Sequence, residues 1–231
     1  MEKQYKIEAH LHTAETSPCG FISAVDFVDM YHALGYDGIF VTDHLHEGFI
    51  SSLDCKDDWN ACIDCFLAGY KKALEHGRQT GLNVMLGAEI RFTGPNDSDY
   101  LIYGFDEDFL RKNPYLHRLN PQEFFRRYGD EILIINAHPY RNGNEVVFVD
   151  CIHGIEVYNS MGRHNNFNEK ALALSKKHPE LYLFAGSDAH QKGDEAGAWM
   201  LFKEPIANSR EFHEAVKRNE YLISQSPVTT N

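Results

Sequence analysis

Short apolar runs alternate with amphipathic stretches along most of this 231-residue chain, and this alternation constrains the fold more than any other feature. Seven runs rich in Ile, Val, Leu, Phe and Tyr are typical of buried strands: residues 5–9, 38–41, 83–86, 100–103, 131–135, 154–157 and 181–185. Five further stretches predict helices: residues 23–34, 58–77, 121–128, 165–178 and 209–218.

Strands that alternate with helices favour parallel βα units. Seven such strands suit a closed or nearly closed barrel, and without a low-complexity linker or a repeat we expect residues 1–231 to form a single domain. An open doubly wound sheet is the alternative. The GxGxxG motif that usually follows its first strand is absent from the sequence.

Net charge and hydropathy exclude several classes of function. The formal net charge is −12, so the field of the protein would repel a phosphate backbone, and we expect no extended nucleic-acid binding. A small phosphorylated substrate stays compatible with this charge, because bound divalent metals can dominate the local field. No run of eighteen apolar residues predicts a membrane span, and the N-terminus does not resemble a secretory signal. We therefore expect a cytoplasmic protein.

The five cysteines are an odd number, which favours free thiols in such a protein. Cys62 and Cys65 have CxxC spacing, which suits a redox pair or half a zinc site. Together with Cys55 they would share one helical face, where small apolar groups pack well. We favour packing, because no second CxxC completes a zinc site.

Polar residues follow the carboxyl ends of the predicted strands. In a parallel barrel these ends share one mouth, where catalytic side chains gather. Nine potential metal ligands would converge there: His10, His12, Asp43, His44, His46, Glu89, His138, Asp188 and His190. The chain has thirteen histidines, and their positions after the predicted strands indicate a metal site more strongly than their number does.

Each of these motifs also has a purely structural interpretation. His10 and His12 alternate on a strand, so both rings point to one side and can share a metal, or can simply face solvent. Asp43 could orient a neighbouring imidazole. Glu89 lies in an apolar segment and needs a cation, which is either a metal or Arg91 two residues later.

The order of the motifs resembles that of the PHP (polymerase and histidinol phosphatase) superfamily. The motifs are His-x-His-Thr, Thr-Asp-His, an isolated Glu, His-Pro and Ser-Asp-x-His, and they extend from His10 to His190. This resemblance implies a distorted (β/α)7 TIM-like barrel with two or three divalent transition metals, usually zinc, iron or manganese.

The resemblance also implies a ligand set. His10, His12, Glu89 and Asp188 would hold one metal, Glu89 and His138 a second, and His44 and His190 a third. Cys19 aligns with one further ligand, and Glu15 is the other candidate. After Glu89 many relatives carry a histidine, whereas this chain has Asp97, Asp99 and Tyr103 and no histidine before His117.

From these residues we predict a metal-dependent phosphoesterase that acts on a small phosphorylated metabolite or nucleotide through a metal-activated hydroxide. His46, His190 and Asp188 are the candidates for catalytic roles, and Arg141, Arg163 and Lys192 for phosphate binding. Two alternatives are another metal-dependent hydrolase, such as an amidohydrolase, and a metal-binding barrel that has lost catalysis. The usual metal-site lysine of amidohydrolases is absent from the Glu89 and His138 motifs.

Overall fold

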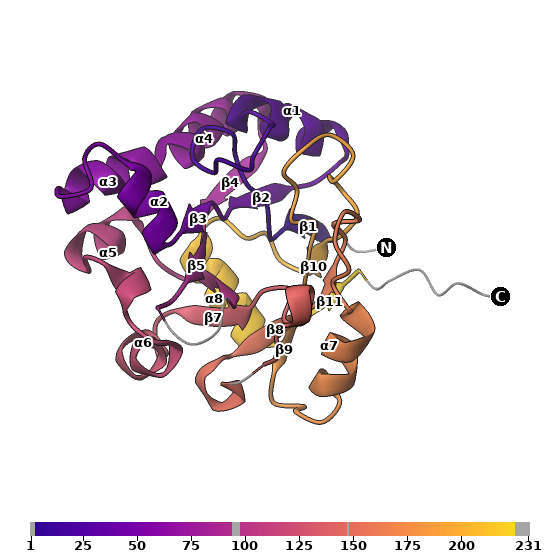
Figure 1. Ribbon diagram of the computed structural model, residues 1–231. Helices are drawn as coiled ribbons and strands as arrows, with labels where there is room; N and C mark the ends of the chain where they lie inside the picture. Colours follow the sequence, from indigo (N-terminus) through magenta and orange to yellow (C-terminus); the bar gives the residue numbers. More distant parts are fainter. Residues whose placement is uncertain (1–2, 94–97, 147, 225–231) are drawn as a thin grey trace.

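Two β-sheets with helices around them make up the fold in a computed structural model, which describes residues 3–93, 98–146 and 148–224 (Figure 1). The strands are β1 (Tyr5–Glu8), β2 (Gly38–Val41), β3 (His44–Leu45), β4 (Asn83–Leu86), β5 (Ala88–Arg91), β6 (Asp99–Tyr103), β7 (Leu133–Asn136), β8 (Gly154–Asn159), β9 (Tyr182–Gly186), β10 (Met200–Phe202) and β11 (Tyr221–Ile223). The α-helices are α1 (Ala24–Ala33), α2 (Glu47–Ser52), α3 (Trp59–Phe66), α4 (Ala68–Thr80), α5 (Glu107–Lys112), α6 (Pro121–Tyr128), α7 (Asn168–Ser175) and α8 (Ser209–Lys217). Three short 3-10 helices cover Leu116–Arg118, Arg141–Gly143 and Val149–Cys151.

The strands are ordered β11-β10-β1-β2-β4 in one sheet and β3-β5-β6-β7-β8-β9 in the other. All seven predicted strands are present, with ends shifted by a few residues at most. The strands that were not predicted are β3, β5, β10 and β11. Strands β3, β10 and β11 have only two or three residues, too few for an apolar pattern to stand out, and β5 carries two charged residues among its four.

The expectation of uniformly parallel strands is wrong for β6, which runs antiparallel to both β5 and β7. Only residues 92–98 separate β5 from β6, whereas a parallel crossover needs a dozen residues or more. The reversal brings the first residue of β6, Asp99, to the edge where the other strands end.

The α/β class is confirmed, but the strands of the described residues form two open sheets rather than a closed barrel. The sheets meet at two junctions. At the first, Glu89 N donates to the Thr42 carbonyl over 3.2 Å, where the chain passes from β2 and β4 into β3 and β5. At the second, Leu11 forms a parallel bridge with Ala189, beyond the ends of β1 and β9.

The helix predicted over residues 58–77 is broken at Leu67 into α3 and α4. The hydroxyl of Thr16 lies at the break, where it donates to the Phe66 carbonyl over 3.1 Å and accepts from Gly69 N over 3.2 Å. A Cβ on Gly69 would lie 1.9 Å from Thr13 Oγ1, so only glycine allows α4 to approach the loop that follows β1.

The other predicted helices are confirmed within a few residues. Ser23 caps α1 by accepting from Asp26 N, and Asn120 caps α6 in the same way ahead of a proline at its first position. Helices α1 and α4 lie next to β2 and β4, and α7 next to β8, whereas α8 lies behind the middle of the strands, where Phe212 packs against side chains of both sheets (Figure 1). None of the helices in the described ranges is both long and apolar enough to cross a bilayer.

Candidate metal centre

The predicted ligands converge at the two junctions between the sheets. His10 and His12 follow β1, and Asp188 and His190 follow β9, so all four lie at the second junction. His44 in β3 and Glu89 in β5 are direct partners in the register of the first junction. His138 follows β7 next to them. All of these side chains are buried except His44, whose side chain is 16 % exposed.

Ligand atoms of His10, His12, Glu89 and Asp188 lie close together. His10 Nε2 lies 3.0 Å from His12 Nε2, and each of these nitrogens is 3.4 Å from a Glu89 oxygen. Asp188 Oδ1 lies 3.4 Å from His10 Nε2 and 3.2 Å from His12 Nε2. Nitrogen and oxygen ligands of a tetrahedral zinc ion are themselves about 3.4 Å apart. The distances of both imidazole nitrogens to the carboxylate oxygens therefore match the spacing within a metal coordination shell.

Buried polar atoms without hydrogen bonds point to the same conclusion. Seven buried side-chain polar atoms of the described residues lack a hydrogen bond, and three of them belong to this cluster: His12 Nδ1, His44 Nδ1 and Asp188 Oδ1, although His44 Nδ1 lies close to a Glu89 oxygen. An unsatisfied buried polar atom costs about 1–3 kcal/mol. Divalent cations bound by imidazole nitrogens and carboxylate oxygens would satisfy such atoms, so this donor set fits zinc, iron or manganese.

Glu89 links the cluster to two further histidines. Its Oε1 accepts from His138 Nε2 over 2.9 Å, and its Oε2 lies 2.8 Å from His44 Nδ1. The predicted alternative, an ion pair between Glu89 and Arg91, is wrong, because Arg91 binds both oxygens of Asp99 at 2.8 Å. Glu89, Asp99 and His138 form a second group whose ligand atoms lie within 4.8 Å of one another.

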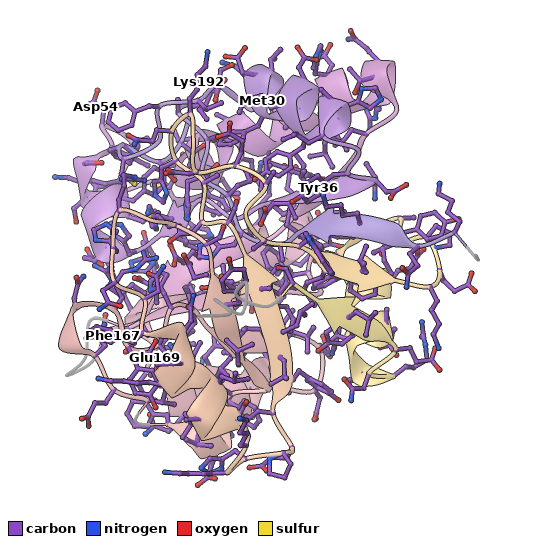
Figure 2. The ribbon with its side chains drawn as sticks, turned by 90° about the vertical axis from the view of Figure 1, so that its right-hand side faces the viewer. Met30, Tyr36, Asp54, Phe167, Glu169 and Lys192 are labelled. Atoms are coloured by element: carbon purple, nitrogen blue, oxygen red, sulfur yellow. The ribbon has the colours of Figure 1, made fainter. Side chains whose placement is uncertain are left out.

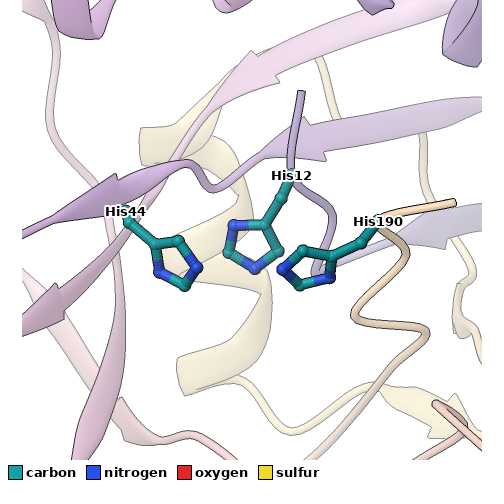
Figure 3. A group of neighbouring side chains, drawn as sticks. All are labelled: His12, His44 and His190. Carbon is teal, nitrogen blue, oxygen red and sulfur yellow. The ribbon is translucent and has the colours of Figure 1, made fainter. Parts of the chain in front are cut away.

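A third group consists of three imidazoles in a row, with His12 between His44 and His190 (Figure 3). The ring centroid of His12 is 4.2 Å from that of His44 and 4.3 Å from that of His190. Cys19 lies against the outer two rings. Burial alone would raise the pKa of the Cys19 thiol, but hydrogen bonds with His190 and His44 lower it to about 6, which favours the thiolate that metals bind.

The charges of the cluster depend on one another. Burial disfavours a protonated His10, yet the carboxylates of Asp188 and Glu156 outweigh it and raise the His10 pKa well above its ordinary value. Burial also favours neutral Asp188, but His10 and His12 hold the pKa of that carboxyl well below its usual range. The carboxylates thus require positive charge beside them, and a divalent cation meets the same requirement.

Sequence reasoning missed Glu156 in β8. Its Oε1 lies 2.9 Å from His10 Nδ1, and its Oε2 accepts from His138 N over 2.9 Å. A carboxylate that receives the Nδ1 proton of a histidine leaves Nε2 free for a metal. The signal was available, because Glu156 is an isolated carboxylate within an apolar strand, as Glu89 is.

A β-bulge in β8 adds Asn159 to the same side of the sheet. The register with β9 shifts between Glu156 and Tyr158, so one residue on β8 is extra. Side chains three positions apart would otherwise face opposite sides of the sheet. Asn159 Nδ2 instead donates to Glu156 Oε2 over 2.9 Å and to Asp188 Oδ2 over 3.3 Å.

Two buried carboxylates support the loops that carry the ligands. Glu8 Oε1 accepts from His10 N over 2.8 Å and from Ser187 N over 3.0 Å. The expectation that Asp43 orients an imidazole is wrong. Its carboxylate instead accepts from Thr13 N, Thr13 Oγ1 and Ser17 Oγ, each over 2.7 Å. Asp43 thus holds the loop that contains Cys19.

Two of the candidate ligands have unusual backbone conformations. His138 has φ = 25° and Asp188 has φ = 54°, in the left-handed region that residues with a Cβ rarely adopt. Such conformations persist where the surrounding structure holds them, and they are concentrated at functional sites. Both turns aim a side chain into the cluster directly after a strand ends.

A cavity of about 380 Å³ opens onto the cluster, and its walls include Cys19, His44, Glu89, His138, Asp188 and His190. Arg91, Arg141 and Arg163 also line it. Arg141 Nη2 donates to Asp188 Oδ2 over 2.6 Å, and Arg163 Nη2 donates to Asp194 over 2.7 Å. The cavity therefore combines metal-binding groups with guanidinium groups that can receive an anion.

Other predicted site residues lie elsewhere. Lys192 is exposed at the surface and does not belong to the described lining of the cavity (Figure 2). His46 caps α2 by accepting from Phe49 N, and burial together with His44 lowers its pKa to about 4. Glu15 accepts from Ala24 N at the start of α1, so Cys19 is the candidate that faces the cavity. Asp97 lies outside the described residues.

Gly186 provides a test of how tightly the cluster is packed. A Cβ on Gly186 would lie 2.5 Å from His10 Cβ and 2.9 Å from Glu156 Oε1. Gly186→Ala is expected to lower the free energy of unfolding in urea by about 1–3 kcal/mol, because a crowded core cannot absorb a methyl group. Gly162→Ala is the control, since a Cβ there meets nothing within 4 Å. Equal stability of the two variants would contradict tight packing.

Comparisons with known proteins concern the family and the fold. A family model described as PHP-associated matches residues 165–221. No curated protein matches the chain. Several solved structures share its fold. A two-domain protein from Bacteroides vulgatus that contains a predicted PHP-like metal-dependent phosphoesterase aligns at TM-score 0.65 and 18 % identity, over 96 % of this chain and 65 % of that one.

Two further structures align with this chain over almost their whole length. PsfC from Pseudomonas syringae aligns at TM-score 0.67 and 14 % identity, over 97 % of this chain and 93 % of that one. A proposed metal-dependent phosphoesterase from Bifidobacterium adolescentis aligns at TM-score 0.56 and 16 % identity, over 92 % and 96 %. The chain spans about two thirds of the Bacteroides protein, and at these identities the likeness concerns the fold.

Proposed function

Since the PHP-associated match and the PHP-like structural neighbours support assignment of this chain to the PHP superfamily, we propose that it is a metal-dependent phosphoesterase. The proposed substrate is a small phosphorylated metabolite or nucleotide, and the proposed cofactors are two or three divalent transition metals. Bound cations of this kind lower the pKa of a water molecule and neutralise the oxygens of the phosphate.

One observation carries this proposal: His10, His12, Glu89 and Asp188 present ligand atoms at coordination spacing, at the edge of a cavity that three arginines line. Groups that bind cations and groups that bind anions thus share one space.

The side chains would then have distinct roles. Glu89 would be shared between the first metal and a second one held with His138, and Asp99 would take the place of the histidine of many relatives. His44, His190 and Cys19 would hold a third metal. Arg141 and Arg163 would orient the phosphate from the cavity wall, although each already binds a carboxylate.

The leaving group needs a proton, and two of the predicted donors differ in their surroundings. His46 lies outside the described lining of the cavity, and its lowered pKa leaves it neutral at pH 7. His190 lines the cavity, and its Nδ1 lies 2.8 Å from the Asp188 carbonyl. Because His190 would itself hold the third metal while its Nδ1 faces the Asp188 carbonyl, we favour water over both histidines as the proton donor.

The test is to purify the protein and measure metal content and hydrolysis together. We expect at least two equivalents of transition metal and hydrolysis of p-nitrophenyl phosphate or its bis-ester. Chelation should abolish hydrolysis, and added Mn²⁺ or Zn²⁺ should restore it. Metal-replete protein that is inactive on a broad panel of phosphate esters would contradict the proposal. Amide substrates in the same panel test the amidohydrolase alternative.

A further inference from the structure

Three cysteines outside the metal centre gather where the turn after α2 meets α3. Cys62 and Cys65 lie on α3, and Cys55 lies in the turn before it. Cys55 Sγ and Cys65 Sγ are in contact, at a distance of 3.8 Å. These three residues do not belong to the described lining of the metal cavity, so the metal centre does not explain their grouping.

The contacting pair is not the CxxC pair of the sequence. Cys62 is fully buried, and its thiol donates to the Cys55 carbonyl over 3.3 Å. Cys65 is exposed and Cys55 is partly exposed. Cys62 is therefore directed inward, and the thiol that faces Cys65 comes from the preceding turn.

The turn is fixed to the helix in a way that keeps Cys55 in place. Asp58 N donates to the Cys55 carbonyl over 2.8 Å, and the Asp58 carboxylate caps α3 by accepting from Ala61 N over 3.2 Å. A disulfide requires its sulfurs to be about 2.05 Å apart. The two sulfurs would thus have to approach by about 2 Å, a movement that side-chain rotation can supply without unfolding the turn.

We propose that Cys55 and Cys65 form a reversible disulfide by exchange with a small-molecule disulfide such as oxidised glutathione. The Cys65 thiolate attacks one sulfur of the oxidant, which forms a mixed disulfide and releases one equivalent of thiol. The Cys55 thiolate then attacks Cys65 Sγ, breaks the mixed disulfide and releases a second equivalent. Two protein thiols are oxidised, the oxidant is reduced to two thiols, and these carry the two protons.

The roles follow from accessibility. Cys65 is the thiol that a reagent in solution reaches, whereas Cys55 is positioned to resolve the mixed disulfide. Burial and the neighbouring Cys55 raise the pKa of the Cys65 thiol, so at neutral pH it is mainly protonated and exchange is slow. The Cys55–Cys65 disulfide would link the turn after α2 covalently to α3.

The test uses the full chain, incubated with oxidised glutathione at about pH 8.5, where more thiolate is present. Remaining thiols are then blocked with N-ethylmaleimide, and the digested protein is mapped by mass spectrometry. We expect a peptide that links Cys55 to Cys65 and disappears after treatment with dithiothreitol. Cys55→Ser should instead accumulate glutathione on Cys65. Cys62→Ser and Cys151→Ser are matched controls that should keep the link.

Three results would overturn the proposal. One is a link between Cys62 and Cys65. Another is glutathione that stays on Cys65 while Cys55 is free to react. The third is a Cys65 that does not react with the oxidant at all. Metal content and the thermal unfolding profile of each variant show that it is folded, and neither measurement depends on the proposed phosphoesterase activity.

Discussion

Glu89→Gln is expected to lower kcat/KM on p-nitrophenyl phosphate roughly 10³-fold and to remove at least one equivalent of bound metal. Glutamine keeps the shape of the side chain but loses its charge. Glu89 is the carboxylate whose two oxygens lie within 3.4 Å of four histidines, His10, His12, His44 and His138. Metal content by plasma mass spectrometry and steady-state kinetics on the same samples check the result.

Glu47→Gln is a matched control for this prediction. The Glu47 carboxylate also contacts a buried histidine, His117, at 2.9 Å, but it is half-exposed on α2 and does not belong to the described lining of the metal cavity. The Glu47→Gln variant should therefore keep its bound metal and its activity. If Glu89→Gln retained full metal content and activity, Glu89 would not be a ligand, and the proposal of shared metals would fail.

Glu156→Gln should weaken metal binding by roughly 10- to 100-fold, the usual cost of losing a carboxylate that orients a metal-binding histidine. Glu156 contacts no metal in the proposed site. Its carboxylate receives His10 Nδ1, His138 N and Asn159 Nδ2, and so fixes the ring orientation of His10 and the backbone of His138. A glutamine oxygen can accept from His10, but its amide nitrogen cannot accept the other donors.

The measurement is the metal dissociation constant from competition with a chromophoric chelator. Glu169→Gln, an exposed change on the neighbouring α7, is the control and should not alter it. A role in folding alone would lower stability and leave the affinity of the folded protein unchanged. Unaltered affinity in Glu156→Gln would thus remove Glu156 from the metal centre.

The sequence predicted elements well where packing follows local pattern. The helix at Pro121–Tyr128 was predicted to the residue, because an asparagine cap, a proline and a following glycine all mark its ends. The sequence predicted elements poorly where a contact between residues far apart in the chain determines where a helix ends or which way a strand runs. The break at Leu67 depends on the hydroxyl of Thr16, and the direction of β6 depends on a short connection after β5.

The convergence of the site was predictable for a similar reason. Ligands at strand ends meet whenever the strands run together, so the position of His10, Glu89 or His138 in the sequence was enough to place it. Asp99 could not be placed in this way, because it begins its strand rather than ending it. Lys192 and His46 follow ligand motifs closely, but proximity in sequence does not determine which way a loop side chain points.

The bulge in β8 allows Glu156 and Asn159 to act on the site together although they are three positions apart. If every residue of β8 paired regularly with β9, Asn159 would turn to the helix-covered side, away from Asp188, because side chains three positions apart face opposite sides of a regular strand. Glu156 would keep its orientation. A redesigned β8 therefore needs either the surplus residue or an asparagine two positions after the glutamate.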